Sequence, residues 1–211
     1  MKIALFGSGM IGQRVAQEAL SRGHEVTAIV RNPARIQFRH PQFTLTEGNA
    51  LNPASVTQLV AGHDVVVSAI KLSENQPLSA VAEAAQSLLE GVKRAGVKRV
   101  LVVGGAGTMN VAPGVRALDV IPIPEEWKPE VMAKIEEWEI YRKNSDLDWT
   151  YFSPPVFIEP GERTGTYRLG IDQLVMNAQG ECRISAEDYA VALLDEIEQP
   201  RFVRQRFSAA Y

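Results

Sequence analysis

Three segments of the chain repeat one pattern, and this repetition limits the folds that the chain can adopt. They read "GHEVTAIV" from Gly23, "GHDVVVSAI" from Gly62 and "GVKRVLVVGG" from Gly96. Each begins with a glycine suited to the left-handed residue that ends a helix, and continues into a β-branched run typical of strands buried on both faces. Amphipathic helical patterns separate these runs. The alternation predicts an α/β fold of the Rossmann type, with a doubly wound parallel sheet between two layers of helices.

The expected elements place most of the chain in this sheet. We expect strands at residues 2–6, 25–30, 42–47, 64–70, 98–103 and 148–152, and a helix that begins at Pro77. From Pro154 the chain is rich in proline and glycine, which predicts a hairpin around Thr164 and Gly165, and Ser185 is expected to cap a last helix. We therefore expect a single domain over residues 1–211, in which residues 153–211 form a small, dependent C-terminal lobe over the carboxyl edge of the sheet.

Composition narrows the classes of partner. The chain has 211 residues, of which 45% are hydrophobic, and its 22 basic and 25 acidic residues give a formal charge of −3. Such a chain can bury one core, and it has no overall positive charge for nucleic acid or a membrane surface. Cys182 is the only cysteine and the three histidines are far apart, so neither a disulfide nor a metal site is predicted. The apolar run "IALF" is too short for a signal peptide, and no run approaches the ~18 residues of a membrane span. We expect a cytoplasmic protein, monomeric or homodimeric, that binds small molecules.

A glycine-rich loop follows the first expected strand directly. The segment "GSGMIG" places Gly7, Gly9 and Gly12 in the spacing GxGxxG, with Ser8, Met10 and Ile11 between them. Glycines at these places permit a tight turn, close approach to a pyrophosphate, and close packing of helix on strand. The free N–H groups at the start of the next helix attract the anion. Between a strand and an amphipathic helix, the motif predicts dinucleotide binding, and a plain glycine-rich turn is the alternative.

The end of the second strand indicates which dinucleotide. About 20 positions beyond the loop, NAD-binding folds offer an acidic residue to the ribose 2′-hydroxyl. This chain has Arg31, followed by Asn32 and Arg35. A guanidinium can hold a 2′-phosphate with two parallel charge-assisted bonds. We therefore expect NADPH to be preferred over NADH, with a solvated surface arginine as the alternative reading.

With these motifs, the sequence resembles the atypical short-chain dehydrogenases/reductases, in the NmrA-like and biliverdin-reductase-B-like branch that includes NADH-flavin reductases of the YwnB type. The resemblance covers nearly the whole chain and rests on "VRNPARI", "EGNALNPASV", "VLVVGGAGTM", "DLDWTYFSPPVFIEPGERTGTYRLG" and "RISAEDYAVALLDEIEQP". Two positions depart from the family pattern: the loop is GxGxxG where many members have GxxGxxG, and Asn49 replaces an aspartate that faces the adenine amino group. The resemblance implies further cofactor contacts at Asn49, Ala69, Ile70, Lys71, Gly104, Lys134, Pro154 and Pro155.

The catalytic pair of short-chain dehydrogenases is incomplete in this chain. The family pairs a tyrosine acid with a lysine four residues later. Lys134 matches that lysine, but the tyrosine position holds Glu130, and a surface ion pair between the two is the structural alternative. The resemblance therefore implies that Lys134 contacts the cofactor ribose.

Other side chains near the expected strand ends are weaker candidates. Thr108 lies where the superfamily often has an active-site serine, and could orient a carbonyl or the nicotinamide amide; it could equally bond its own backbone. Tyr167 is a second candidate acid, whereas Tyr141 is expected to be a packing residue. We expect core or lobe packing for Trp127, Trp138 and Trp149.

The lack of an assigned proton donor favours one class of acceptor. Hydride transfer to a flavin or quinone needs chiefly orientation, with protons taken from water. We therefore expect an NADPH-dependent reductase of a flavin-like, quinone or other planar acceptor. A non-catalytic NADP-binding sensor of the NmrA-like type is the alternative, and a nucleotide-sugar epimerase is a distant third. We expect the substrate cleft between residues 71–76, residues 105–113 and the C-terminal lobe.

Overall fold

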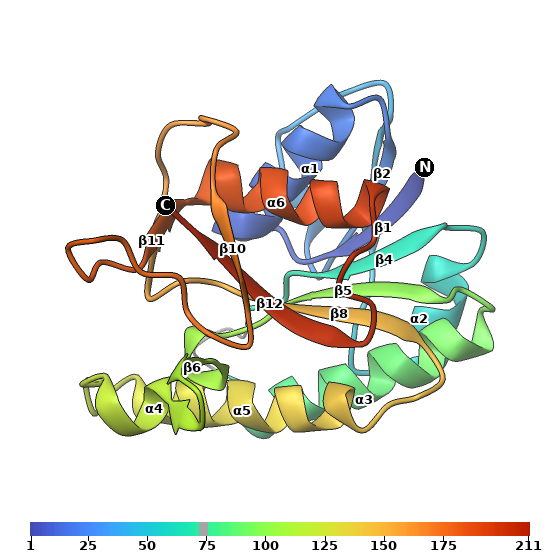
Figure 1. Cartoon of the computed structure of the whole chain (residues 1–211). Helices are drawn as coiled ribbons and strands as arrows, with labels where there is room; N and C mark the ends of the chain where they lie inside the picture. Colours follow the sequence, from blue (N-terminus) through green and yellow to red (C-terminus); the bar gives the residue numbers. More distant parts are fainter. Residues whose placement is uncertain (72–75) are drawn as a thin grey trace.

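The computed structural model describes residues 1–71 and 76–211 and is built around one eight-stranded sheet (Figure 1). All neighbouring strands are parallel except β10, which pairs antiparallel with β12. In spatial order the strands are β10 (Arg168–Ile171), β12 (Gln205–Ala210), β8 (Asp148–Ser153), β5 (Arg99–Val103), β4 (Val65–Ser68), β1 (Lys2–Phe6), β2 (Glu25–Val30) and β3 (Phe43–Glu47). The chain order reverses direction between β1 and β4, and ligands of such sheets bind outside the carboxyl ends of the strands at this point.

Helices cover both faces of the sheet (Figure 1). The helices α1 (Met10–Ser21) and α6 (Ala186–Glu198) pack together on one face. The opposite face is covered by α2 (Pro53–Val60), α3 (Ser79–Arg94) and α5 (Lys128–Arg142). The shorter elements are η1 (Pro33–Arg35), η2 (Ala106–Thr108), α4 (Ala117–Val120), the strand pair β6 (Asn110–Ala112) and β7 (Val115–Arg116), and the strand pair β9 (Phe157–Glu159) and β11 (Arg183–Ser185).

The first strand shows why a continuous apolar run was needed. Ile3 and Leu5 point into the core shared with α1 and α6, whereas Ala4 and Phe6 point into the core shared with α2, α3 and α5. Successive side chains of a strand face opposite sides of a sheet, so a strand covered on both sides must be apolar at every position.

The predicted strands are present, with small shifts at their ends. The fourth is shorter than expected, because Ala69 and Ile70 leave the sheet and line the cleft described below. The helix expected from Pro77 begins at Ser79. Ser185 caps α6 as predicted, since its hydroxyl accepts a hydrogen bond from the Asp188 N–H (3.0 Å).

Two expectations for the C-terminal region are wrong. Residues 153–211 are no lobe laid over the sheet, since they supply β12, β10 and α6 to its main layers. The expected hairpin around Thr164 and Gly165 is absent: β9 pairs with β11 and β10 pairs with β12. Instead, the Thr164 hydroxyl and the Gly165 N–H both donate to the carboxylate of Asp188, which is fully buried in α6. Gly165 permits this turn because its φ is +71°.

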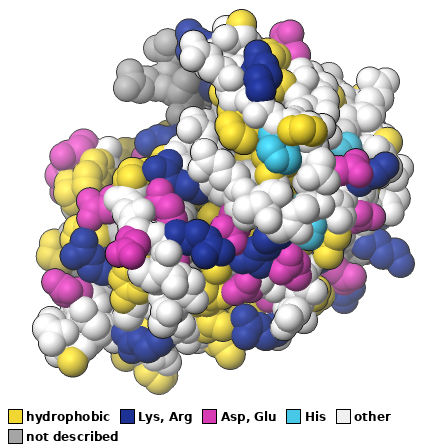
Figure 2. Space-filling model, turned by 90° about the horizontal axis from the view of Figure 1, so that it is seen from above, with side chains coloured by type: hydrophobic (Ala, Val, Ile, Leu, Met, Phe, Trp, Pro, Cys, Tyr) yellow, Lys and Arg dark blue, Asp and Glu magenta, His cyan; other side chains and the backbone are white. Residues whose placement is uncertain are grey.

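An ion pair joins α1 to the segment between β9 and β10. Glu18 of α1 is 6% exposed and accepts hydrogen bonds from Arg22 and Arg163, each at 2.8 Å. The bond from Arg163, followed by that from Arg22, outweighs burial and lowers the pKa of Glu18. Figure 2 shows basic and acidic side chains interspersed over the face seen from above. Among the described residues of this face, charges of both signs therefore alternate without a single-sign patch (Figure 2).

Candidate functional site

The phosphate loop lies at the carboxyl end of β1, where the strand order reverses. Gly9 is the N-cap residue of α1, and the helix begins at Met10. Gln13 fixes the loop from the first turn, because its side chain donates to the carbonyl of Ser8 (2.9 Å). The N–H groups of the first helical turn have no partner within the helix, so this end of α1 suits an anion.

Glycine stands at the three positions of the loop for different physical reasons. Gly7 has a φ of +102°, and a side-chain carbon there would lie 2.2 Å from the carbonyl oxygen of Ala69. A carbon on Gly12 would lie 2.3 Å from the carbonyl oxygen of Gly7. Both glycines are therefore required by the fold. At Gly9 the added carbon meets no atom within 4 Å, so the protein itself leaves this space open.

A cleft of about 360 Å³ opens from this loop. Its size falls within the roughly 300–1,000 Å³ of small-molecule sites. We call it the cofactor cleft, and it is lined by Phe6, Gly7, Ser8, Gly9, Ile29, Val30, Arg31, Gly48, Asn49, Ala50, Leu51, Ala69, Ile70, Lys71, Gln76, Ala80 and Ala84. Apolar walls with a phosphate loop at one end and a guanidinium at the rim fit the adenosine half of a dinucleotide.

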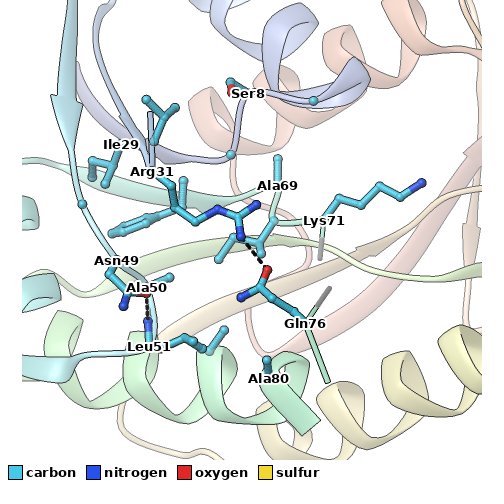
Figure 3. Close-up of a pocket in the computed structure, with 17 residues that line it drawn as sticks. Ser8, Ile29, Arg31, Asn49, Ala50, Leu51, Ala69, Lys71, Gln76 and Ala80 are labelled. Atoms are coloured by element: carbon cyan, nitrogen blue, oxygen red, sulfur yellow. Dashed lines mark hydrogen bonds between the residues drawn. The ribbon is translucent and has the colours of Figure 1, made fainter. Parts of the chain in front are cut away.

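Two polar groups mark the adenosine end of the cleft (Figure 3). Arg31 follows β2, and its guanidinium points across the opening and donates to Gln76 Oε1 (2.6 Å). Asn49 follows β3, and its amide oxygen accepts from the Leu51 N–H (3.0 Å). That oxygen has a second lone pair, which leaves it able to accept from an adenine amino group. Lys71 extends away from this pair in the figure.

The remaining predicted cofactor residues lie outside this cleft. Met10, Ile11 and Gly12 are in the first turn of α1, and the Asn32 side chain caps η1 by accepting from the Ala34 N–H (3.1 Å). Arg35 lines a neighbouring pocket of about 270 Å³ behind the phosphate loop, together with Phe38. Gly104 follows β5 and Pro154 and Pro155 follow β8, at the carboxyl edge of the sheet, and their cofactor contacts stay predictions.

In η2, which follows β5, the Thr108 hydroxyl faces inward. Thr108 is 8% exposed, donates to the carbonyl of Gly105 (2.7 Å), and lies 2.8 Å from the Ser153 hydroxyl. Its carbonyl accepts a hydrogen bond from Arg206. The structure thus shows the local bonding that sequence reasoning gave as the alternative. The catalytic role of Thr108 stays a prediction.

Lys134 lies beside the end of β5, and its ion pair is not the one that the structural alternative offered. Its ammonium bonds Glu137 Oε2 (2.8 Å) and the carbonyl of Val103 (3.3 Å) instead of Glu130, and its contact with the cofactor ribose stays a prediction. Glu137 is 4% exposed and also accepts from the Tyr151 hydroxyl (2.9 Å). Burial, and then the charge of Glu137, raise the pKa of Tyr151 well above its usual value, so this phenol stays a donor.

The aromatic candidates are spread over the molecule. Tyr141 is a fully buried packing residue, as expected. Tyr167 bonds Asp195 of α6 and lines a different pocket. Trp138 packs edge-to-face on Trp149, with ring centroids 5.7 Å apart. The packing expected for Trp127 is wrong, because this side chain is 60% exposed.

Sequence reasoning assigned no contact to two polar residues of the site, although Gln76 was part of the expected cleft boundary. Gln76 meets Arg31 from a segment 45 positions away, and no local pattern indicates such a contact. Glu137 is three residues after Lys134, and residues three apart on a helix are neighbours. Its contact was therefore predictable from spacing, whereas the family pattern points only to the position four before Lys134. Of the expected cleft boundary at 71–76, residues 72–75 lie outside the described part of the chain.

Two classes of feature are absent from the described part of the chain. Over residues 1–71 and 76–211, no group of three or more His, Cys, Asp or Glu side chains is placed to hold a metal ion. No helix within the same ranges is both long and apolar enough to cross a membrane.

Comparisons with known proteins agree with this geometry. A family model described as NAD(P)H-binding matches residues 7–200. YwnB of Bacillus subtilis is 38% identical over 99% of this chain and 97% of its own length. A structure from Bacteroides thetaiotaomicron, named a "putative epimerase", is 38% identical, with a TM-score of 0.92 over 100% of this chain and 96% of that one. A Streptococcus pneumoniae structure, named a "putative NADH-flavin reductase", is 32% identical, with a TM-score of 0.89 over 100% and 99%.

These matches span almost the whole chain, and they coincide with the phosphate loop, the strand order and the cleft. The fold is therefore of the Rossmann type, and the phosphate loop lies at the point where the strand order reverses. The chain belongs to the NAD(P)H-binding family and, within it, to the atypical short-chain dehydrogenases/reductases.

Proposed function

We propose that this protein is an NADPH-dependent reductase that acts on a flavin, a quinone or another small planar acceptor. When bound, NADPH supplies a hydride from its nicotinamide, and with one proton from water the acceptor is reduced and NADP⁺ is formed. The chain's own residues bind the cofactor, orient it and shape the space for the acceptor.

The preference for NADPH is proposed from the rim of the cofactor cleft. The Arg31 guanidinium points into the cleft at the end of β2, where an acidic residue would repel a 2′-phosphate. The phosphate can be bound by two parallel N–H donors, and Gln76 can keep the guanidinium at the rim. Each charge-assisted bond contributes about 1.5–3 kcal/mol, which corresponds to a roughly 10- to 150-fold preference over NADH.

The single observation that supports the acceptor class is the placement of the tyrosines. The chain has five tyrosines, all of them in the described part, and none lines the cofactor cleft. Three of them are fully buried, namely Tyr141, Tyr151 and Tyr189. The hydroxyls of Tyr167 and Tyr211 donate to carboxylates of α6. No tyrosine is therefore available as the usual proton donor of the superfamily.

Planar acceptors fit a site without such a donor. Reduction of a simple carbonyl requires a proton delivered to the forming alkoxide, whereas flavins and quinones accept hydride and then take protons from water. The name of the Streptococcus relative supports this class of acceptor. An epimerase, which the Bacteroides relative is named for, is disfavoured because its acid–base pair also needs a tyrosine.

The test is a panel of acceptors offered to purified protein with NADPH or NADH. We expect oxidation of NADPH with FMN, riboflavin or a quinone, slower oxidation of NADH, and little reaction with simple aldehydes and ketones. Faster turnover of carbonyl substrates than of any flavin or quinone would contradict the acceptor class.

One observation favours a second candidate, an NADP-binding sensor. The hydroxyl of Thr108 and the ammonium of Lys134 both bond protein groups in this structure, which suits structural roles for these two residues. A sensor would bind NADPH and NADP⁺ with different affinities but oxidise NADPH with none of the acceptors. The same panel therefore distinguishes the two candidates.

A further inference from the structure

The ammonium of Lys134 is bound at two points inside the protein. A lysine ammonium has three N–H donors. In the described part of the chain, two are accounted for by Glu137 Oε2 and the carbonyl of Val103, at the end of β5. One donor remains for a ligand beside the end of β5, outside the cofactor cleft.

The lysine stem is also confined. A side-chain carbon added to Gly105 would lie 3.0 Å from Cβ and 3.2 Å from Cγ of Lys134, so the backbone of Gly105 lies directly against the stem. Only 18% of the Lys134 side chain is exposed. A four-carbon stem is flexible when it is free in solvent, and its contacts with Gly105 and Glu137 restrict its rotamers before any ligand binds.

Glu137 is in turn held in one position. It is 4% exposed, and the Tyr151 hydroxyl, 2.9 Å from Glu137 Oε2, orients its carboxylate. Gly104 allows this contact, because a side-chain carbon there would lie 2.1 Å from the Tyr151 ring. The two glycines after β5 therefore let Tyr151 and Lys134 approach the same carboxylate.

We propose that Glu137 is a positioning residue, whose buried carboxylate holds the Lys134 ammonium at the end of β5 with one donor directed to the hydroxyls of the nicotinamide ribose. Glu137 does not touch the cofactor and acts through Lys134. The assignment of Lys134 to the ribose rests on the proposed function, whereas the contact between Glu137 and Lys134 is observed. Pre-organisation of this kind raises affinity because the ligand does not have to immobilise the side chain.

The experiment measures binding of two ligands by calorimetry. NADPH includes the nicotinamide ribose, whereas 2′,5′-ADP is only the adenosine half of the dinucleotide. We expect Glu137→Gln to weaken NADPH binding about 3- to 10-fold and to change 2′,5′-ADP binding by less than about 2-fold. In a Lys134→Met background, the same substitution should change NADPH binding by less than about 2-fold, since contacting residues in one network are not additive.

The matched control is Glu139→Gln. This substitution removes a carboxylate from the same helix, where it pairs with Arg142 on the surface (2.6 Å), and both ligands should bind as they do to the unaltered protein. If Glu137→Gln does not fold, Glu137→Asp retains the charge, shortens the reach to the ammonium, and should show the same difference between the two ligands.

Three results would overturn the proposal. They are equal weakening of NADPH and 2′,5′-ADP, which indicates general loosening; an undiminished effect in the Lys134→Met background; and unchanged NADPH binding by a folded Glu137→Gln variant. These measurements need no acceptor. If the protein binds NADPH but reduces no acceptor, the proposed reductase function is contradicted. The affinities for NADPH and 2′,5′-ADP still decide the role of Glu137 in that case.

Discussion

Replacement of Gly9 by valine should separate cofactor binding from folding. Gly9 has φ −72° and ψ −167°, a conformation open to any L-residue, and its added side-chain carbon meets no protein atom within 4 Å. The cost to folding is the poorer N-cap preference of valine, about 1 kcal/mol or less. Gly9→Val should therefore melt within a few degrees of the unaltered protein.

The cost to binding is much larger, because the valine side chain occupies the space that a pyrophosphate needs. Displacing the phosphate from the N–H groups of α1 loses at least one charge-assisted bond, about 1.5–3 kcal/mol. Overpacking adds about 1–3 kcal/mol. Together these terms come to about 2.5 kcal/mol or more, so NADPH affinity should fall by roughly 60-fold or more.

Calorimetric titration with NADPH and a thermal melt give both numbers for Gly9→Val. Gly7→Ala is the contrasting variant: its added carbon meets the Ala69 carbonyl at 2.2 Å in a backbone with φ +102°, so it should lose stability by about 1–3 kcal/mol. A folded Gly9→Val protein with unchanged NADPH affinity would contradict pyrophosphate binding at this loop, because the loop would then be only a turn.

Further predictions concern Arg31 at the rim of the cofactor cleft, Lys134 beside the end of β5, and Glu18 of α1. Arg31→Ala should weaken NADPH by about 10-fold or more and leave NADH nearly unchanged by calorimetry, whereas Arg39→Ala, outside the cleft, should affect neither; equal weakening of both cofactors would count against the 2′-phosphate contact. Lys134→Met should raise the KM for NADPH while the single-turnover hydride step, followed by stopped flow at saturating NADPH, stays largely intact; a loss of about 100-fold in that step would instead indicate that the lysine supplies or tunes a proton. Glu18→Gln should lower stability by roughly 1–2 kcal/mol at neutral pH. Because Arg163 and then Arg22 lower the folded-state pKa of Glu18 below 4.5, this difference is fully present above pH 4.5 and should shrink as the pH falls through the folded-state pKa; a difference that does not change with pH in denaturant melts would exclude the ion pairs as its cause.

Strands buried on both faces could be predicted from the sequence because their apolar runs are continuous. The strand Gln205–Ala210 could not, since its sequence "QRFSAA" mixes polar and small residues. It becomes a strand through its pairing with Asp148–Ser153, which tertiary contact supplies and local preference does not. The turn at Gly165 was misread for a related reason, since its partner, Asp188, lies 23 positions away.

The candidate site divides in the same way. The positions of Gly7, Gly9 and Arg31 in one cleft could be predicted, because the motif places them at the ends of neighbouring strands. Side-chain direction was not readable: Thr108 faces inward, and Arg35 lies in the pocket behind the phosphate loop. The direction of a side chain depends on packing partners distant in sequence, and such partners have no local pattern.

The most direct test of the proposed function is the rate of NADPH oxidation by the unaltered protein with FMN, riboflavin and a quinone as acceptors. For an NADPH-dependent reductase we expect turnover with at least one of these acceptors, a higher kcat/KM for NADPH than for NADH, and a loss of that preference in Arg31→Ala. Tight NADPH binding without turnover of any of these acceptors would contradict the reductase and favour the sensor.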